Sequence, residues 1–425
     1  MKRYIRIFLL IMVLLVVGCT NSDSSLKESV ASDEIKEKTD EVEKQSNQKL
    51  NEEQKEDTPK ASIREEEQEV KETITLEEKI EAYMQQMTIE EKIGQLFMIA
   101  IRKDQQGEPI TQMNEEVKKL LTTYPVGGII LFKENIVTAK QTQELISDLQ
   151  AMSTIPLFIG VDEEGGSVSR VGSNSQINEV PFKIAFSIGE TGDPELAYKE
   201  ATRMGKLLKS LGFNMDFAPV ADIYNEPGNT VIGKRSFGET AETVTPMVIR
   251  FAEGLIQEGI QPVLKHFPGH GNTLEDSHEG LAYINKSLEE LELEELIPFT
   301  KALESGVGAL MRGHLMVKTV DDSLPASLSP IWGNYILAHY DCDNILLMTD
   351  AMDMGAIQNQ YSVEEAALLC IEAENDICLM PADIGKAYTA LVEGYKEGRL
   401  TEERINRSVR KILSKKVAQN SLVLE

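Results

Sequence analysis

Short runs of apolar residues recur along the chain from residue 97 onward, and each is followed by a polar loop and an amphipathic stretch. There are eight such runs: Phe97–Ile101, Gly127–Phe132, Ile155–Val161, Asn214–Val220, Ile260–His266, Val307–His314, Asn344–Asp350 and Asp376–Met380. The runs are continuous rather than alternating, which is typical of strands buried on both faces of a parallel sheet. Eight strand–helix units predict an α/β fold, specifically a single-domain (β/α)₈ TIM barrel, with a doubly wound sheet as the alternative.

The stretches between these runs carry apolar residues three and four positions apart, as amphipathic helices do. They predict helices at Glu195–Leu211, Thr243–Gly259, Leu288–Ser305 and Glu364–Glu374. Two more helices are expected before the first strand, because Thr75 with Glu78, and Thr88 with Glu91, have the spacing of capping boxes.

The first 73 residues differ in composition from the rest. Residues 1–19 begin with basic side chains, run apolar through Val17 and reach Gly18-Cys19, which resembles the lipobox of a bacterial lipoprotein signal. Residues 20–73 are mostly Glu, Lys, Ser, Gln and Asn without an aromatic residue, which predicts a disordered acidic stalk. We therefore expect lipidation at Cys19, an extracytoplasmic, membrane-anchored protein and a folded domain at 74–425. An uncleaved membrane anchor with an incidental cysteine is the alternative.

Charge and cysteine usage narrow the possible partners. The net charge of −27 and the absence of a Lys/Arg stripe argue against binding to nucleic acid. Cys342, Cys370 and Cys378 lie in or beside apolar segments, so we expect buried free thiols rather than a disulfide framework. We expect the protein to be a monomer.

Polar residues gather where the predicted strands end. They are Asp162, Asp216, Asp222, Lys265, His266, His314 and Asp350, and the segment KHFPGHGNTLEDSHEG from Lys265 to Gly280 adds His270, Asp276 and His278. In a barrel the chemistry lies at the carboxyl ends of the strands. Taken singly, each residue could be a satisfied cap or hydrogen-bond partner; taken together, they predict a site. A metal site built from His266, His270, His278, His314 and Asp350 is a second reading, although the paired HxH spacing is absent.

KHFPGHGNTLEDSH resembles the signature of family 3 glycoside hydrolases, in particular the β-N-acetylglucosaminidase (beta-hexosaminidase) branch. Five more segments resemble family motifs in the same order: VDEEGGSVSR (family pattern D-x-E-G-G-x-V-x-R), NMDFAPVADI, VIGKRSFG, SLPASLS and MTDAMDMGAI. The resemblance implies a (β/α)₈ barrel and a retaining exo-β-N-acetylglucosaminidase that needs neither a metal nor another cofactor.

The resemblance also assigns roles. Asp350 is implied as the nucleophile and His278 as the general acid and base, oriented by Asp276. Asp162, Arg170, Arg235, Lys265 and His266 are implied to grip the sugar. Histidine suits this role because it can donate and then accept a proton near neutral pH. Together with the lipoprotein signal, this favours GlcNAc-containing cell-wall saccharides, such as muropeptides from peptidoglycan, as substrates.

Three other functions stay open: a non-catalytic glycan-binding lipoprotein, a metal-dependent barrel hydrolase, and a phosphorylase that uses phosphate in place of water. Several side roles are also expected. Glu163 and Glu164 should face solvent or a helix dipole, His270 should shape a loop, Trp332 should pack, and His339 should lie on the surface. Arg312 and Asp353 depart from the family pattern, and either could contact a charged leaving group or form an ion pair.

Overall fold

The computed structural model describes residues 74–274 and 280–424. Each of the eight apolar runs contains a strand: β1 (Phe97–Ala100), β2 (Gly128–Ile130), β3 (Phe158–Val161), β6 (Met215–Asp216), β7 (Gln261–Pro262) continued by β8 (Leu264–Phe267), β10 (Ala309–Arg312), β12 (Leu346–Thr349) and β13 (Cys378–Leu379). All pairings among them are parallel, as the continuous apolar runs predicted.

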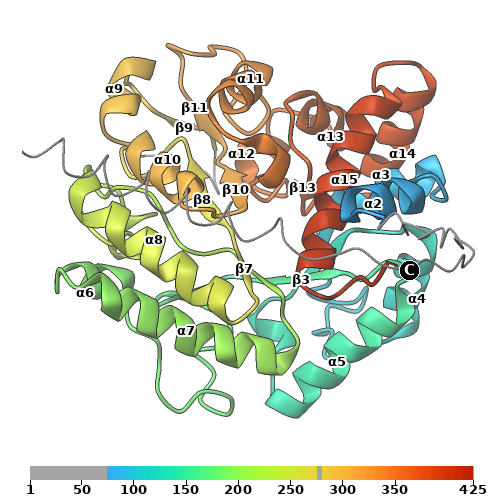
Figure 1. Ribbon diagram of the computed structural model, residues 1–425, viewed down its shortest axis with the longest axis horizontal. Coiled ribbons are helices and arrows are strands. Elements are labelled where there is room, and N and C mark those ends of the chain that lie inside the picture. Colours follow the sequence, from blue (N-terminus) through green and yellow to red (C-terminus); the bar gives the residue numbers. More distant parts are fainter. Residues whose placement is uncertain (1–73, 275–279, 425) are drawn as a thin grey trace, which may run out of the picture. The chain divides into compact units, whose positions relative to one another are not determined.

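These strands form two hydrogen-bonded sheets, in the orders β13-β1-β2-β3-β6-β7 and β12-β10-β8. Isolated parallel bridges at Val220–Lys265 and Met348–Ile377 connect the two sheets. The result is an α/β fold with a curled parallel sheet, so the α/β part of the predicted fold class is confirmed (Figure 1). Closure into a complete eight-stranded barrel stays a prediction.

Helices alternate with the strands. Their bounds are α2 (Leu76–Met84), α3 (Ile89–Gln95), α4 (Glu115–Thr123), α5 (Ala139–Met152), α6 (Ala185–Gly189), α7 (Pro194–Leu211), α8 (Ala241–Gln257), α9 (Leu288–Leu293), α10 (Leu296–Glu304), α11 (Pro330–His339), α12 (Gly355–Gln358), α13 (Val363–Glu372), α14 (Ile384–Lys396) and α15 (Glu402–Ala418). Both predicted capping boxes are present, at Thr75 with Glu78 and at Thr88 with Glu91. The long helices α7 and α8 lie side by side (Figure 1).

The helix predicted at Leu288–Ser305 is interrupted, and forms α9 and α10 instead. The break falls at Glu294 and Glu295, whose carboxylates both pair with Lys286. Glu295 is buried and also accepts a hydrogen bond from Asn225 at 2.7 Å. A continuous helix would conflict with this inward turn, so tertiary pairing overrides the helical periodicity.

Two small sheets that the apolar pattern does not predict shape the loops. β4 (Glu163–Gly165) and β5 (Val168–Ser169) form an antiparallel hairpin directly after β3, and β9 (Ala282–Tyr283) pairs in parallel with β11 (Leu315–Met316). Gly165 and Gly166 make the hairpin turn with φ of 79° and 64°. A side chain at Gly165 would be strained, and its Cβ would lie 2.5 Å from the carbonyl oxygen of Lys183.

The burial or exposure of individual side chains tests several predictions. Trp332 is fully buried and packs edge-on against Phe267, with ring centroids 5.4 Å apart, as expected of a packing residue. The three cysteines Cys342, Cys370 and Cys378 are buried free thiols. His339 is exposed and stacks on Tyr335.

Arg312 does neither of the two things that the sequence left open. Its side chain is fully buried and donates hydrogen bonds to the carbonyl oxygens of Ala326, Ser329 and Ala373. Desolvation lowers the pKa of Arg312 to about 9. This guanidinium ties β10 to two neighbouring loops.

The predicted signal peptide, Cys19 and stalk lie outside the described residues. In the part of the chain that the structure does describe, no helix is long and apolar enough to span a membrane.

A buried lysine on α15 makes the stability of this fold depend on pH. Lys416 is fully buried, donates to Gln95 Oε1 at 2.7 Å and lies over the ring of Phe158. Desolvation lowers its pKa to about 7. In the unfolded chain its pKa is about 10.4, so between these values unfolding takes up a proton and stability rises with pH.

We therefore expect the free energy of unfolding to rise between pH 7 and pH 9 by about 1 to 2 kcal/mol more in the wild type than in Lys416→Met. Urea denaturation at the two pH values measures this difference. The exposed lysine variant Lys301→Met should keep the wild-type pH dependence. An equal pH dependence in Lys416→Met would contradict the assignment.

Candidate active site

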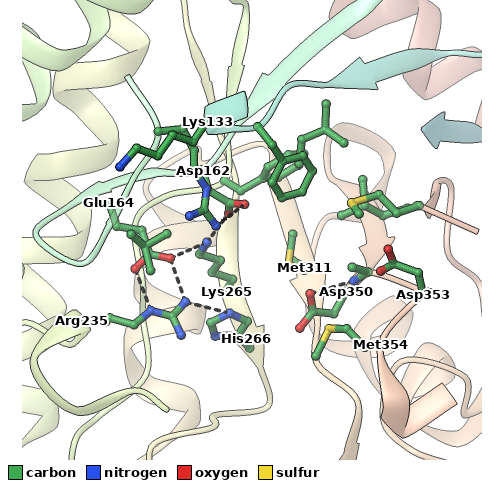
Figure 2. Close-up of a pocket in the computed structure, with 18 of the residues that line it drawn as sticks. Lys133, Asp162, Glu164, Arg235, Lys265, His266, Met311, Asp350, Asp353 and Met354 are labelled. Atoms are coloured by element: carbon green, nitrogen blue, oxygen red, sulfur yellow. Dashed lines mark hydrogen bonds and ion pairs between the residues drawn. The ribbon is translucent and has the colours of Figure 1, made fainter. Parts of the chain in front are cut away.

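A cavity of about 350 Å³ lies where the parallel strands end. It brings together six of the residues that the sequence singled out: Asp162, Arg170, Arg235, Lys265, His266 and Asp350. Asp162 and Asp350 directly follow β3 and β12, and Lys265 and His266 lie within β8. Arg170 directly follows the hairpin strand β5, and Arg235 ends the 3₁₀ turn Gly233–Arg235. Asp276 and His278 lie outside the described residues. Figure 2 shows Asp350 on the wall of the cavity opposite Glu164, Lys265 and Arg235.

Four charged side chains form a connected network on one wall. The ammonium group of Lys265 lies 2.8 Å from Asp162 Oδ1 and 2.6 Å from Glu164 Oε1. Arg235 binds Glu164 through two hydrogen bonds of 2.8 Å, from Nε and Nη2 (Figure 2). Two cations and two carboxylates therefore share this wall, and a planar guanidinium suits the two-point contact.

The expectation that Glu163 and Glu164 face solvent was wrong. Their exposed fractions are 0 % and 4 %, because the chain turns back after β3 as the β4–β5 hairpin and directs both side chains inward. Glu163 accepts hydrogen bonds from the backbone of Val171 and Gly172, which holds the segment that follows Arg170. The signal was present in the family pattern D-x-E-G-G, which keeps the position of Glu164 acidic.

The electrostatics of Glu164 follow from its two cationic partners. Burial alone would raise its pKa, but Arg235 and Lys265 outweigh this effect and lower the pKa to about 2. Lys265 is 2 % exposed, and its pKa is raised because Asp162 and Glu164 outweigh its own desolvation. Glu164 and Lys265 are therefore both ionised at neutral pH. Arg170 extends the network, with Nη2 3.8 Å from Asp162 Oδ2.

Asp350 follows β12 and is held by the backbone. Its Oδ1 accepts a hydrogen bond from the amide of Ala351 at 2.8 Å. Burial raises the pKa of Asp350, but His266 and His314 oppose it, and the net shift is downward. His314 also contacts the carbonyl oxygen of Ala351 through Nε2 at 2.9 Å, and its Nδ1 contacts Ser327 Oγ. An ionised carboxylate thus lies in a fixed position on the cavity wall.

The histidines of the KHFPGHG segment are held by a carboxylate behind them. Asp222 is fully buried and its Oδ2 lies 2.7 Å from His266 Nδ1. His270 is buried, its backbone amide donates to Asp222, and its ring contacts Thr273 Oγ1 at 2.7 Å, which agrees with a loop-shaping role. Sequence reasoning noted Asp222 at the end of a strand but gave it no role.

The metal reading requires several histidine nitrogens to converge. Instead, both ring nitrogens of His314 contact protein partners, and His266 Nδ1 faces Asp222. Within residues 74–274 and 280–424, no group of three His, Cys, Asp or Glu side chains could hold a metal ion.

Comparison with known proteins decides the family. The model of the glycosyl hydrolase family 3 N terminal domain matches residues 88–415. The chain belongs to glycosyl hydrolase family 3. The family predicted from the motifs is thereby confirmed.

Matches to individual relatives support the same family. The chain is 32 % identical to Beta-hexosaminidase A of Pseudoalteromonas piscicida, over 74 % of this chain and 57 % of that protein. It is 32 % identical to Beta-hexosaminidase LpqI of Mycobacterium tuberculosis, over 71 % of this chain and 78 % of the relative. Among solved structures, a family 3 beta-N-acetylglucosaminidase from Paenibacillus sp. str. FPU-7 matches with a TM-score of 0.73 and 36 % identity, over 80 % of this chain and 65 % of that one. The chain thus spans less than two thirds of the first and third of these proteins.

The charged network predicts a measurable loss of stability when Glu164 is neutralised. We expect Glu164→Gln to lower the free energy of unfolding at pH 7 by about 3 kcal/mol, because Lys265 and Arg235 lose a buried partner. The folded pKa of Glu164, about 2, lies below its ordinary value of 4.5, so this stabilisation is present above pH 4.5 and is lost as the pH falls toward 2.

Urea denaturation at pH 7 and pH 3 tests this, and the gap between wild type and variant should narrow at the lower pH. A matched control is Glu304→Gln, which breaks an exposed pair with Lys301 and should cost less than about 0.5 kcal/mol. Equal stability of the two variants at pH 7 would show that the Glu164 network contributes nothing.

Proposed function

We propose that the protein is a retaining exo-β-N-acetylglucosaminidase that removes terminal non-reducing GlcNAc through a covalent intermediate on Asp350. The observation that carries the proposal is the cavity itself. An ionised, backbone-anchored carboxylate faces a wall of hydrogen-bonding side chains across a space of about 350 Å³. Relatives with the names beta-hexosaminidase and beta-N-acetylglucosaminidase support the choice of sugar.

The nucleophile is Asp350. In the first step its carboxylate oxygen bonds to the anomeric carbon while the bond to the leaving oxygen breaks, and an acid protonates that oxygen. In the second step water attacks the same carbon, a base takes its proton, and Asp350 is released. We assign the acid and base role to His278, oriented by Asp276, on the sequence resemblance alone.

The opposite wall binds the sugar. Lys265, Arg235 and Arg170 supply donors, while Asp162, Glu164 and His266 supply acceptors for hydroxyl groups. A volume of about 350 Å³ lies at the small end of the range for ligand pockets. This suits one terminal sugar ring rather than a chain, and so favours exo action.

The rest of the substrate has room beside this cavity. A neighbouring hollow of about 640 Å³ shares Arg102, Glu134, Asp353 and Met380 with the cavity. We propose that it receives the leaving group, and that the substrates are GlcNAc-containing saccharides derived from peptidoglycan. The bridges at Val220–Lys265 and Met348–Ile377 further support a closed (β/α)₈ barrel around the site.

The nucleophile assignment predicts that Asp350→Ala lowers the turnover of an aryl β-GlcNAc by about 10⁴-fold or more, since both steps need the carboxylate. Asp353→Asn, which removes a nearby charge, should stay within about tenfold of the wild type. A fluorinated GlcNAc substrate that traps the intermediate should add one sugar mass to the peptide that contains Asp350.

The same assay separates the alternatives. A non-catalytic glycan-binding protein would bind GlcNAc without releasing the aryl group, and a metal-dependent hydrolase would lose its activity after dialysis against EDTA. Substantial turnover by Asp350→Ala would remove the basis of the mechanism.

We also propose that the protein is anchored outside the cytoplasm by lipid on Cys19. Full-length protein expressed in a bacterium that processes lipoproteins should fractionate with membranes, whereas Cys19→Ser should lose the acyl chains that hold it there. Metabolic labelling with a radioactive fatty acid measures the modification directly. Cys342→Ser is the control and should stay both labelled and membrane-bound; membrane retention of unlabelled Cys19→Ser would favour an uncleaved anchor.

A further inference from the structure

We propose that Asp222 is a positioning residue that holds His266 as the neutral Nδ1–H tautomer and presents Nε2 to the cavity as a hydrogen-bond acceptor. The inference deepens the proposed function and rests on it for the meaning of the cavity. Its structural core, the protonation pattern of one imidazole, can be measured without any activity.

The carboxylate of Asp222 faces one side of the imidazole ring. Asp222 is fully buried, and three N–H groups converge on it: His266 Nδ1 at 2.7 Å, the backbone amide of His270 at 2.7 Å and the backbone amide of His266 at 3.2 Å. Burial raises the pKa of Asp222, but these N–H groups stabilise the ionised carboxylate, and the net shift is downward. An ionised carboxylate can only accept hydrogen bonds, so Nδ1 of His266 carries the proton.

The guanidinium of Arg235 faces the other side of the ring. Its Nη2 lies 3.4 Å from His266 Nε2, and the guanidinium is held in place by Glu164 and by the carbonyl oxygen of Val231. A guanidinium has only donors, so the nitrogen opposite it must accept. Asp222 and Arg235 therefore impose the same tautomer from opposite sides of the ring.

This arrangement decides what the wall offers a sugar. His266 is only 6 % exposed, yet it lines the cavity beside Lys265 and Arg235. With Nε2 unprotonated, an acceptor stands among cationic donors, and a sugar hydroxyl can donate to it. With the other tautomer, Nε2–H would face a cationic donor and the acceptor would be lost.

Asp222 also joins two segments of the chain. Through His266 and His270 it holds the end of β8 and the start of the next loop against the segment after β6. The approach is close, because a Cβ at Gly271 would lie 1.7 Å from the carbonyl oxygen of Ile223. Side-chain and backbone contacts thus fix the position of the ring as well as its tautomer.

Asp222→Asn separates charge from shape. An amide has one acceptor oxygen and one donor NH₂, so it cannot accept from all three N–H groups. We expect its NH₂ to face His266 Nδ1 and to move the ring proton to Nε2. The loss of the acceptor should lower kcat/KM for an aryl β-GlcNAc by about 10- to 100-fold.

The first measurement is ¹⁵N NMR of histidine-labelled protein. With only five histidines in the chain, the ring signals of His266 can be assigned by their loss in His266→Gln. The wild type should show Nδ1–H and unprotonated Nε2 at His266, and Asp222→Asn should show the reverse. A wild-type ring with Nε2–H would overturn the proposal, even if the variant does not fold.

The second measurement asks whether Asp222 acts through His266. In the His266→Gln background the Asp222→Asn change should cost about threefold or less in kcat/KM, because the ring it orients is absent. A purely structural role would give the same cost in both backgrounds and would overturn the proposal. Asp321→Asn is a matched control, since it removes a buried carboxylate that accepts from Ser323, Leu324 and Ser329 away from the cavity, and its kcat/KM should match the wild type.

The two measurements also distinguish failure of this inference from failure of the proposed function. If the wild type does not turn over aryl β-GlcNAc, the proposed activity fails while the tautomer result still stands. If turnover is present and the tautomer does not respond to Asp222→Asn, only the positioning role fails.

Discussion

A buried ammonium group must be compensated, and the site is organised around the way Lys265 meets this demand. At 2 % exposure it has almost no water, so Asp162 and Glu164 supply the opposite charges. Glu164 is itself shared with Arg235. Removing any one partner would leave an uncompensated charge in a medium of low polarity, which costs far more than the pairs gain. The network therefore confines four side chains to one geometry before any sugar arrives.

The path of the backbone places the partners of Lys265 and the other side chains of the site. The acids reach Lys265 because the chain after β3 folds into the β4–β5 hairpin, whose turn uses two glycines with positive φ. Asp222 likewise holds His266 in place from behind the cavity wall. Through His266 and His270 it connects the end of β8 to the segment after β6. Asp350, on the facing wall, is held by the amide of Ala351. One wall is thus rich in paired charges, while the facing wall carries the backbone-anchored carboxylate of Asp350. This arrangement suits a reaction in which one group attacks and the others bind.

Much of the fold and of the candidate site could be predicted from the amino-acid sequence. Period and continuity of the apolar runs predicted the parallel strands, because burial on both faces removes the need for alternation. Motif order predicted the family and placed Asp162, Arg235, Lys265 and Asp350 near one another. The predictions failed where long-range charge pairing competes with local pattern. Glu295 interrupts a helix to reach Lys286. Glu164 turns inward to pair with Lys265 and Arg235, although acidic side chains usually face water.

By itself, then, the amino-acid sequence determined the strand and helix pattern, the family and the residue types of the site, because periodicity and short motifs are local properties. Only the tertiary structure decided which charges pair, that Arg312 ties loops together instead of meeting a ligand, and that Asp222 and Arg235 face the same imidazole from two sides. The physical reason is that charge pairing and tautomer choice depend on distances of a few ångströms between segments far apart in the chain. No local pattern encodes those distances.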